Sequence, residues 1–269
     1  MGDEGKLYVP EDEVPAYKRL LQDADLILPN QFEAELLSGT KITSLSSIAT
    51  AVQTLHKTYK IPHIIITSVC LPPSLSTTAD PETLTIIGST ATSDLLPRLW
   101  RIDVPAYPVF FSGTGDMLAA LVSFRLREAV FAAGLQNTAR WWAPDGFAGG
   151  VATELPLARA AEMAVASMQG VLGKTFERYV EEVGRLEGLE SREAHLRRTR
   201  ATEVRVVGNV EDLREPPGVE KYRAKPVDAG FRVNDVERLE ELRVKLVGEG
   251  QRDGMVHAVN DKRFAPSPS

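Results

Sequence analysis

The segment Phe111–Met117 (Phe-Ser-Gly-Thr-Gly-Asp-Met) places two glycines and one carboxylate directly before an apolar helical pattern. Glycine allows positive φ and a close approach of the backbone to a ligand. The following helix presents unpaired N–H groups and the positive end of its dipole, which together form an anion site. Because Asp116 would repel an anion, its carboxylate fits a base that deprotonates a nucleophile attacking a bound phosphate. The alternative is a helix start in which Asp116 only interacts with the dipole.

A second polar pair follows a short apolar run. Ala24–Pro29 predicts a buried strand, and Asn30–Gly39 predicts a helix. Asn30 is a good N-cap and Glu33 stands at the capping-box spacing, so helix capping alone can explain both residues. In the functional interpretation, the Glu33 carboxylate at the strand's C-terminal edge holds hydrated magnesium. Open α/β sheets bind ligands at that edge.

The composition of the 269 residues is that of one large or two modest globular domains, with 43% hydrophobic and 25% charged residues. The net charge of −6 argues against nucleic acid as a partner, because phosphate neutralisation needs clustered basic residues. The single cysteine, Cys70, excludes an internal disulfide and fits a reducing compartment. The sequence contains neither a run of about 18 apolar residues nor a signal peptide, so we expect a cytoplasmic protein without a membrane partner.

The apolar patterns predict a mixed α/β fold. A helix is expected over Ser44–Tyr59 with Thr43 as its cap. His63–Ser68 is a continuous apolar run that ends in two hydroxyls, which is typical of a buried strand opening on a site. Thr83–Thr90 and Leu99–Val104 predict two further strands, antiparallel and joined by a polar turn.

The second half of the chain alternates helices with irregular segments. Gly134–Thr153 predicts a long surface loop, and a long helix follows through Leu157–Val171. Glu203–Val207 alternates like a strand, and Val233–Val247 predicts an amphipathic helix before a disordered end at Pro266–Ser269. The four histidines have no metal-ligand spacing, so we assign them no role.

Four phrases of this sequence occur in the order seen in pyridoxal kinases, which belong to the ribokinase-like superfamily. The Asn30–Gly39 run resembles a pyridoxal kinase signature, whereas Gly-Thr-Gly-Asp is shared more widely in the superfamily. Arg200–Pro217 is similar to the closing strand and acidic tail of these kinases. The four phrases are Leu7–Pro10, Pro29–Gly39, Ile66–Ser68 and Gly113–Asp116.

The resemblance implies an α/β fold, a ribokinase-like three-layer sandwich with a mostly parallel sheet that lacks its N-terminal portion. It covers residues 1–217, which correspond to the nucleotide and phosphoryl-transfer part of a kinase domain. Residues 218–269 are expected to form an extension made of an amphipathic helix and a disordered end. Met1 coincides with the methionine inside the family's Asp-Pro-Val-Met-Gly-Asp motif. We therefore expect an N-terminally truncated form without much of the vitamin pocket.

The family phosphorylates the 5′-hydroxymethyl group of pyridoxal, pyridoxine or pyridoxamine with magnesium ATP. By resemblance, Asp116 is the base that deprotonates this alcohol. The backbone of Gly113, Thr114 and Gly115 resembles the anion hole for the transferred phosphoryl group. These roles agree with the chemistry, because phosphoryl transfer mainly needs positioning and charge stabilisation.

The resemblance also implies sites for the metal and the nucleotide. Glu33 resembles the acid that orders water around Mg²⁺, and Asp3 resembles the last acid of the Asp-Pro-Val-Met-Gly-Asp motif near the metal. The family is dimeric, so a homodimer is expected, and the need for a monovalent cation stays open. The residues that resemble the family's ATP-binding positions are Asn30, Thr67, Ser68, Val104 and Tyr107.

Two alternatives remain open at this point. The first is another superfamily kinase, for hydroxymethylpyrimidine or a sugar, although the Asn30–Gly39 phrase weighs against it. The second is a non-catalytic fragment that binds nucleotide or pairs with a full-length subunit. Because the vitamin pocket is incomplete, we expect this chain alone to be inactive rather than active. The kinase interpretation requires that Asp116 does not face bulk solvent far from the Asn30–Glu33 segment.

Overall fold

The computed structural model describes residues 2–3, 6–7, 9–69, 83–186 and 191–227. They belong to one compact unit, Met1–Val227, which continues somewhat beyond the boundary expected after residue 217. Cys70 and the expected Val233–Val247 helix lie outside the described residues. Within the described ranges, no helix is both long and apolar enough to cross a membrane.

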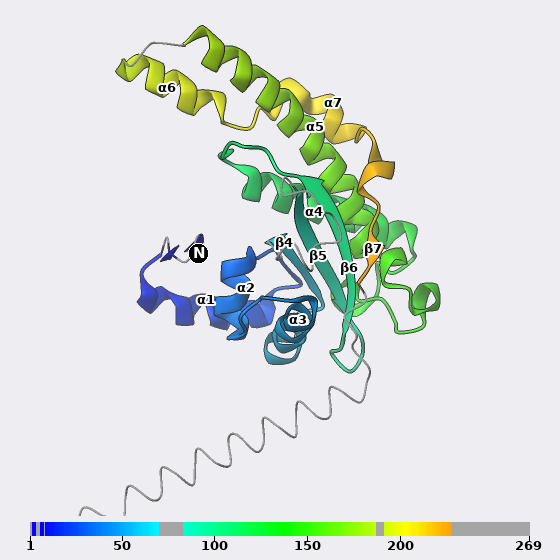
Figure 1. Cartoon of the computed structure of the whole chain (residues 1–269). Helices are drawn as coiled ribbons and strands as arrows, with labels where there is room; N and C mark the ends of the chain where they lie inside the picture. The colour runs from blue at the N-terminus through cyan, green and yellow to red at the C-terminus, as the bar shows by residue number, and fades with distance from the viewer. Residues whose placement is uncertain (1, 4–5, 8, 70–82, 187–190, 228–269) are drawn as a thin grey trace, which may run out of the picture. The chain divides into compact units, whose positions relative to one another are not determined.

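A five-stranded sheet in the order β3-β4-β5-β6-β7 forms the centre of this unit (Figure 1). Only the β3–β4 pair is parallel, and the other three pairs are antiparallel. The expected mostly parallel sheet is thus limited to β3–β4 in the described part, because β5 and β6 are consecutive strands joined by a short turn. The strands are β3 (Leu26–Ile27), β4 (His63–Val69), β5 (Thr83–Ala91), β6 (Pro97–Pro105) and β7 (Lys225–Pro226).

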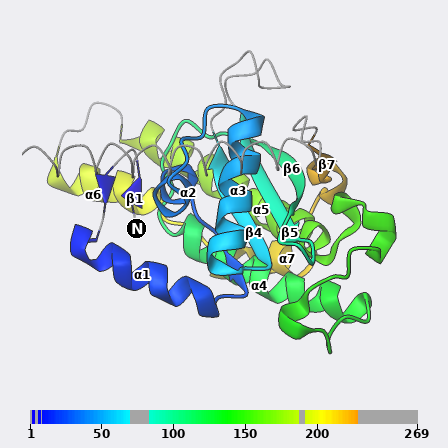
Figure 2. The ribbon, with the colours of Figure 1, turned by 90° about the horizontal axis from the view of Figure 1, so that it is seen from below.

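Helices cover both faces of the sheet, which confirms the α/β class (Figures 1 and 2). In β4, Ile64 and Ile66 pack with α2 and α3, whereas Ile65 packs on the opposite face with α4 and α5. Burial of both faces explains the unbroken apolar run of this strand. The α-helices are α1 (Val14–Leu20), α2 (Gln31–Ser38), α3 (Leu45–Tyr59), α4 (Thr114–Ala132), α5 (Pro156–Arg185), α6 (Arg192–Ala201) and α7 (Val210–Arg214).

Short elements complete the unit. A separate antiparallel pair joins β1 (Gly2–Asp3) to β2 (Lys6–Leu7). Much of the expected 134–153 loop is irregular, with three single-turn segments inside it. The 3₁₀ turns are Glu11–Glu13, Leu21–Asp23, Ala139–Trp141, Phe147–Gly150, Ala152–Glu154, Val207–Asn209 and Val219–Tyr222.

The edge strand β7 is held by a buried carboxylate of α5. Glu162 is only 2% exposed. Its Oε2 accepts a hydrogen bond from Arg223 Nη1 at 2.6 Å, and its Oε1 accepts one from the Ala224 amide at 2.9 Å. Arg159 of the same helix donates to Glu162 as well, at 3.2 Å. These contacts place β7 beside Trp100 and Arg101 of β6.

Two local predictions were wrong. Ser44 caps α3, one residue later than expected, because its side chain and Ser47 form a reciprocal capping box. The Glu203–Val207 segment is not a strand: Glu203 makes a single parallel bridge with Ser112. The chain that would pair further turns into α4 directly after Ser112, so no ladder can form, and Val207 is 89% exposed at the start of a 3₁₀ turn.

Candidate functional site

The register of the sheet brings several sequence-predicted site residues to one end. Val69 at the end of β4 pairs with Thr85 near the start of β5, which pairs with Asp103 near the end of β6. The last residue of β6, Pro105, pairs with Thr83. The C-terminal ends of β4 and β6 therefore lie at the same end of the sheet, and the chain leaves β6 there on its way to Gly113.

Asn30 joins this end through the backbone of the preceding residue. β3 runs parallel to β4, and the Thr67 amide donates a hydrogen bond of 2.9 Å to the Pro29 carbonyl. The β4–β5 ladder is irregular between Ile66 and Val69, so it is interrupted at Thr67 and Ser68. Bulges of this kind often lie next to functional sites, where they turn side chains out of the ladder. The backbone that leads into Asn30 thus lies beside Thr67, and the predicted contact of Asn30, Thr67 and Ser68 with ATP stays a prediction.

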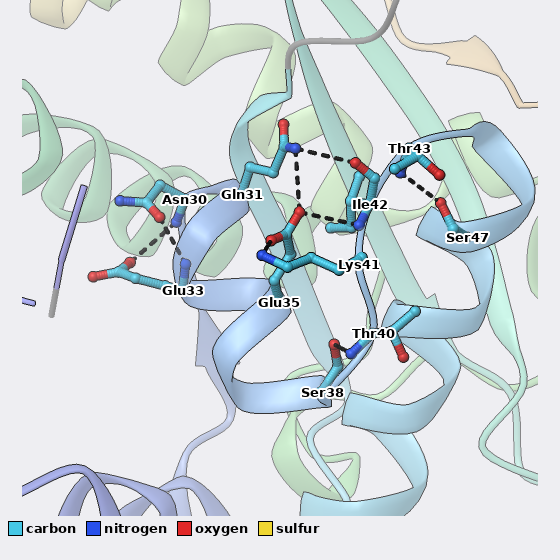
Figure 3. Close-up of polar contacts among 10 residues, drawn as sticks. All are labelled: Asn30, Gln31, Glu33, Glu35, Ser38, Thr40, Lys41, Ile42, Thr43 and Ser47. Carbon is cyan, nitrogen blue, oxygen red and sulfur yellow. Dashed lines mark hydrogen bonds and ion pairs between the residues drawn. The ribbon is translucent and has the colours of Figure 1, made fainter. Parts of the chain in front are cut away.

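The N-terminus of α2 is closed by its own side chains (Figure 3). Asn30 Oδ1 accepts a hydrogen bond from the Glu33 amide at 2.8 Å. In return, Glu33 Oε2 accepts one from the Asn30 amide at 3.1 Å. The sequence-predicted capping box is confirmed, and Gly39 ends the helix at φ 70°. The box fixes the direction of the Glu33 carboxylate at the sheet's end.

Glu35 ties α2 to the segment that leads into α3 (Figure 3). Its carboxylate accepts hydrogen bonds from Lys41 Nζ at 2.5 Å and from the Ile42 amide at 3.0 Å. Gln31 donates to it at 3.3 Å. Burial raises the pKa of Glu35, but these donors together bring it below the ordinary value. The network fixes α2 to the segment that leads into α3.

The N-terminus of α4 is built differently. Gly113 adopts φ 90° at the N-cap, and this helix start has no side-chain cap hydrogen bond in the described part of the chain. The first intrahelical bond runs from the Met117 amide to the Gly113 carbonyl at 3.1 Å. The amides of Thr114, Gly115 and Asp116 precede that bond, so they are the donors that a helix start presents to an anion.

Asp116 lies in the first turn of α4 and its side chain is exposed. Gly113 and Gly115 are exposed as well, and a Cβ on Gly115 would have no heavy atom within 4 Å. The carboxylate is therefore accessible beside the open amides. A base in a closed active site would be shielded from water, whereas Asp116 is exposed.

β1 lies against α2, so Asp3 and Glu33 belong to adjoining elements. No group of three or more His, Cys, Asp or Glu side chains forms a metal site within the described residues. Mg²⁺ in phosphoryl-transfer sites is usually bound by one or two carboxylates together with substrate phosphates and water. The Glu33 carboxylate fits that requirement, and the metal role of Asp3 stays a prediction.

Val104 and Tyr107 have packing roles that are independent of a ligand. Val104 of β6 is 6% exposed and belongs to a core cluster with residues of α4 and α5. The Tyr107 ring contacts Phe111 edge-to-face at 5.5 Å and lies 5.2 Å from the Phe176 ring of α5. Burial raises the pKa of the Tyr107 hydroxyl. Their predicted contact with ATP stays a prediction.

The sequence patterns did not predict that residues 202–204 contact the Gly113 turn. They bond the backbone of Ser112, and Val204 packs against Gly113. Only the short alternating stretch hinted at β-like pairing there. The same segment continues into a charged groove of about 1130 Å³ between α5 and α6, and none of the predicted site residues lines it.

A mixed sheet between two helical layers, with a glycine-preceded helix start at the end of the sheet, is the arrangement of the ribokinase-like α/β class. The solved structure of pyridoxal kinase from Leishmania donovani in complex with ADP superimposes with a TM-score of 0.57 at 24% identity. The match covers 84% of this chain and 60% of that one. This likeness confirms the expected fold.

By sequence, the chain is similar to pyridoxal kinases. The pyridoxal kinase of Arabidopsis thaliana is 31% identical over 218 residues, which cover 80% of this chain and 56% of the relative. That of Homo sapiens is 39% identical over 125 residues, covering 44% and 38%. Residues 2–128 match the family described as phosphomethylpyrimidine kinase. The chain spans about half the length of the curated relatives it matches.

Proposed function

We propose that this chain carries the nucleotide and phosphoryl-transfer part of a pyridoxal kinase, which transfers the γ-phosphoryl group of ATP to the 5′-hydroxymethyl group of a B6 vitamer. The observation that carries the proposal is the convergence at one end of the sheet. The Asn30–Glu33 segment, Thr67 and Ser68 lie at the same end from which the chain enters the open α4 start. Relatives named pyridoxal kinase support the choice of substrate.

The chemistry follows from the two helix starts. The backbone around Gly113, Thr114 and Gly115 binds and orients the transferred phosphoryl group, since first-turn amides point at an incoming anion. Asp116 accepts the alcohol proton as the alcohol oxygen attacks phosphorus. Asn30, Thr67 and Ser68 orient the phosphate chain. Glu33 and Asp3 would hold Mg²⁺, which neutralises phosphate charge when bound.

The direct test is pyridoxal-dependent ADP formation by the 269-residue chain with magnesium ATP. If the chain turns over, Asp116→Asn should lower kcat about 10²–10⁴-fold, because a general base is lost. Asp94→Asn is the matched control, since Asp94 is an exposed aspartate in the turn at the opposite end of β5 and β6. Retention of most of the turnover by Asp116→Asn would reject Asp116 as the base.

A second candidate is a non-catalytic fragment that binds nucleotide or pairs with a longer subunit. The exposure of Asp116 favours it. Calorimetric titration with ATP separates the two functions: binding without vitamer-dependent ADP formation supports the fragment. Sedimentation of the chain alone tests the expected homodimer.

The family match also keeps a related substrate in view, because its description is phosphomethylpyrimidine kinase. Parallel assays with pyridoxal, hydroxymethylpyrimidine and a sugar decide among them. A higher kcat/KM for hydroxymethylpyrimidine than for pyridoxal would overturn the choice of vitamer. Repeating the assay with sodium in place of potassium tests the need for a monovalent cation.

A further inference from the structure

A segment far along the chain runs beside the Gly113 turn. The Ser112 amide donates to the Thr202 carbonyl at 3.1 Å, and the Val204 amide donates to the Ser112 carbonyl at 3.3 Å. Both backbone groups of Ser112 are thus bonded to the residues on either side of Glu203. We call residues 202–204 the strap.

The strap also limits the space around Gly113. A Cβ placed on Gly113 would lie 3.0 Å from Val204 Cγ2, so the Val204 side chain packs directly against the glycine. Gly113 has φ 90°, a conformation that L side chains rarely adopt. The half-buried Val204 isopropyl group therefore closes one side of a turn that the Ser112 hydrogen bonds hold in place.

The chain that follows the strap is fixed by charged side chains. Arg125 of α4 is 8% exposed, and its Nη2 donates to the carbonyls of Leu213 at 2.7 Å and Arg214 at 3.0 Å. Lys174 of α5 pairs with Asp212 at 2.6 Å. The residues after the strap thus reach α4 a second time, at Arg125, and α5 at Lys174. These anchors keep the strap in register with the start of α4.

We propose that the strap positions the open N-terminus of α4, with Val204 as a positioning residue for the phosphoryl-transfer site. The inference rests on the proposed function of that helix start. A helix start without a side-chain cap has no local group that fixes its amides, yet transfer requires them within fractions of an ångström of the productive geometry. The strap supplies this constraint from outside the turn. Val204 itself touches neither nucleotide nor vitamer in this role.

The first experiment uses the ligand-free chain. In Val204→Gly, the packing on Gly113 is lost while the N–H that bonds Ser112 is kept. We expect faster hydrogen exchange at the Ser112 amide, by about tenfold or more, because the turn opens locally. The Gly113 and Thr114 amide resonances should shift as well. Val204→Thr keeps the branched shape and should restore both signals. Val207→Gly is the matched control at an 89% exposed side chain.

The second experiment adds magnesium ATP and pyridoxal. Val204→Gly should lower kcat by about tenfold with little change in the KM for pyridoxal, because misplaced amides weaken transition-state binding more than substrate binding. Val204→Thr should recover the rate. If the chain has no turnover, the readout is the shift of the Thr114 and Gly115 amides on ATP addition, which Val204→Gly should reduce.

The two ideas fail separately. If the wild-type Thr114 and Gly115 amides do not respond to ATP, the phosphoryl site is refuted, while the ligand-free data still decide the strap. Unchanged Ser112 exchange and unchanged Gly113 resonances in Val204→Gly overturn the strap. Equal changes in Val207→Gly overturn it too, because they would show a general loss of local stability.

Discussion

The helix starts of α2 and α4 differ in how their first amides are satisfied. At α2, the Asn30 side chain accepts a hydrogen bond from the Glu33 backbone N–H, and the Glu33 side chain accepts one from the Asn30 backbone N–H. At α4, a glycine at φ 90° stands at the N-cap, without a side-chain cap bond among the described residues, and the turn is held by residues 202–204. The first start is complete in itself. The start of α4 is open to a ligand, and residues 202–204, far along the sequence, hold its turn in place.

The largest effect on stability is expected at Gly113. Gly113→Ala should lower the free energy of unfolding by about 2 kcal/mol, because a side chain is strained at positive φ and meets Val204. Gly115→Ala should be neutral or stabilising by up to about 1 kcal/mol. Its added Cβ would meet no other atom, and alanine favours the helical conformation more than glycine does. Urea unfolding of both variants is the measurement. An equal loss of unfolding free energy in both variants would contradict a special role of the positive φ at Gly113.

A smaller loss is expected at the closed start. Asn30→Ala should cost about 1 kcal/mol of unfolding free energy, because the Glu33 amide loses its acceptor. Thr114→Ala at the start of α4 should change it by less than about 0.5 kcal/mol, because no side-chain cap is removed there. The same urea titrations test both. A loss at Thr114 as large as that at Asn30 would contradict the contrast between the two helices.

The smallest expected effect is a pH dependence of the unfolding free energy that arises from Glu35 of α2. The folded-state pKa of Glu35 lies below its ordinary value of 4.5, so its stabilisation is present above pH 4.5 and is lost as pH falls through the folded pKa. Glu35→Gln should therefore be less stable than wild type at neutral pH, by about 1 kcal/mol or less, since Lys41 is largely exposed.

The measurement is the difference in unfolding free energy between wild type and Glu35→Gln across pH 3–7. That difference should shrink below pH 4.5. Comparing the two proteins cancels the titration of groups they share, including the buried His56 and His63, whose pKa values burial lowers to about 4. A difference that stays constant with pH would show that Glu35 acts only through packing.

Local sequence patterns were sufficient where the controlling interactions are local. The Asn30–Glu33 spacing predicted the capping box, and Thr83–Thr90 with Leu99–Val104 predicted the antiparallel pair of β5 and β6. The convergence of Asn30 with Thr67 could not be read from spacing alone, because it depends on the pairing of β3 with β4. The resemblance to known kinases, rather than residue physics, had placed them together.

Predictions failed where the outcome depends on a distant partner. Glu203–Val207 alternates like a strand, but only Ser112 offers backbone groups before the chain turns into α4. Strand pairing is decided by the neighbour as much as by the segment itself. For the same reason, no local pattern predicted that Val204 would pack on Gly113.

The buried carboxylate of Glu162 holds the C-terminal residues of the compact unit through charge and hydrogen bonds. Proteolytic removal of the chain from residue 219 onward would take away Arg223 and the Ala224 backbone N–H. Among the partners of Glu162 in the described part of the chain, its buried carboxylate would then keep Arg159. An under-compensated interior charge is costly. Such a cut would therefore destabilise α5. It would also loosen the segment 202–217, which α5 holds through the ion pair of Lys174 with Asp212.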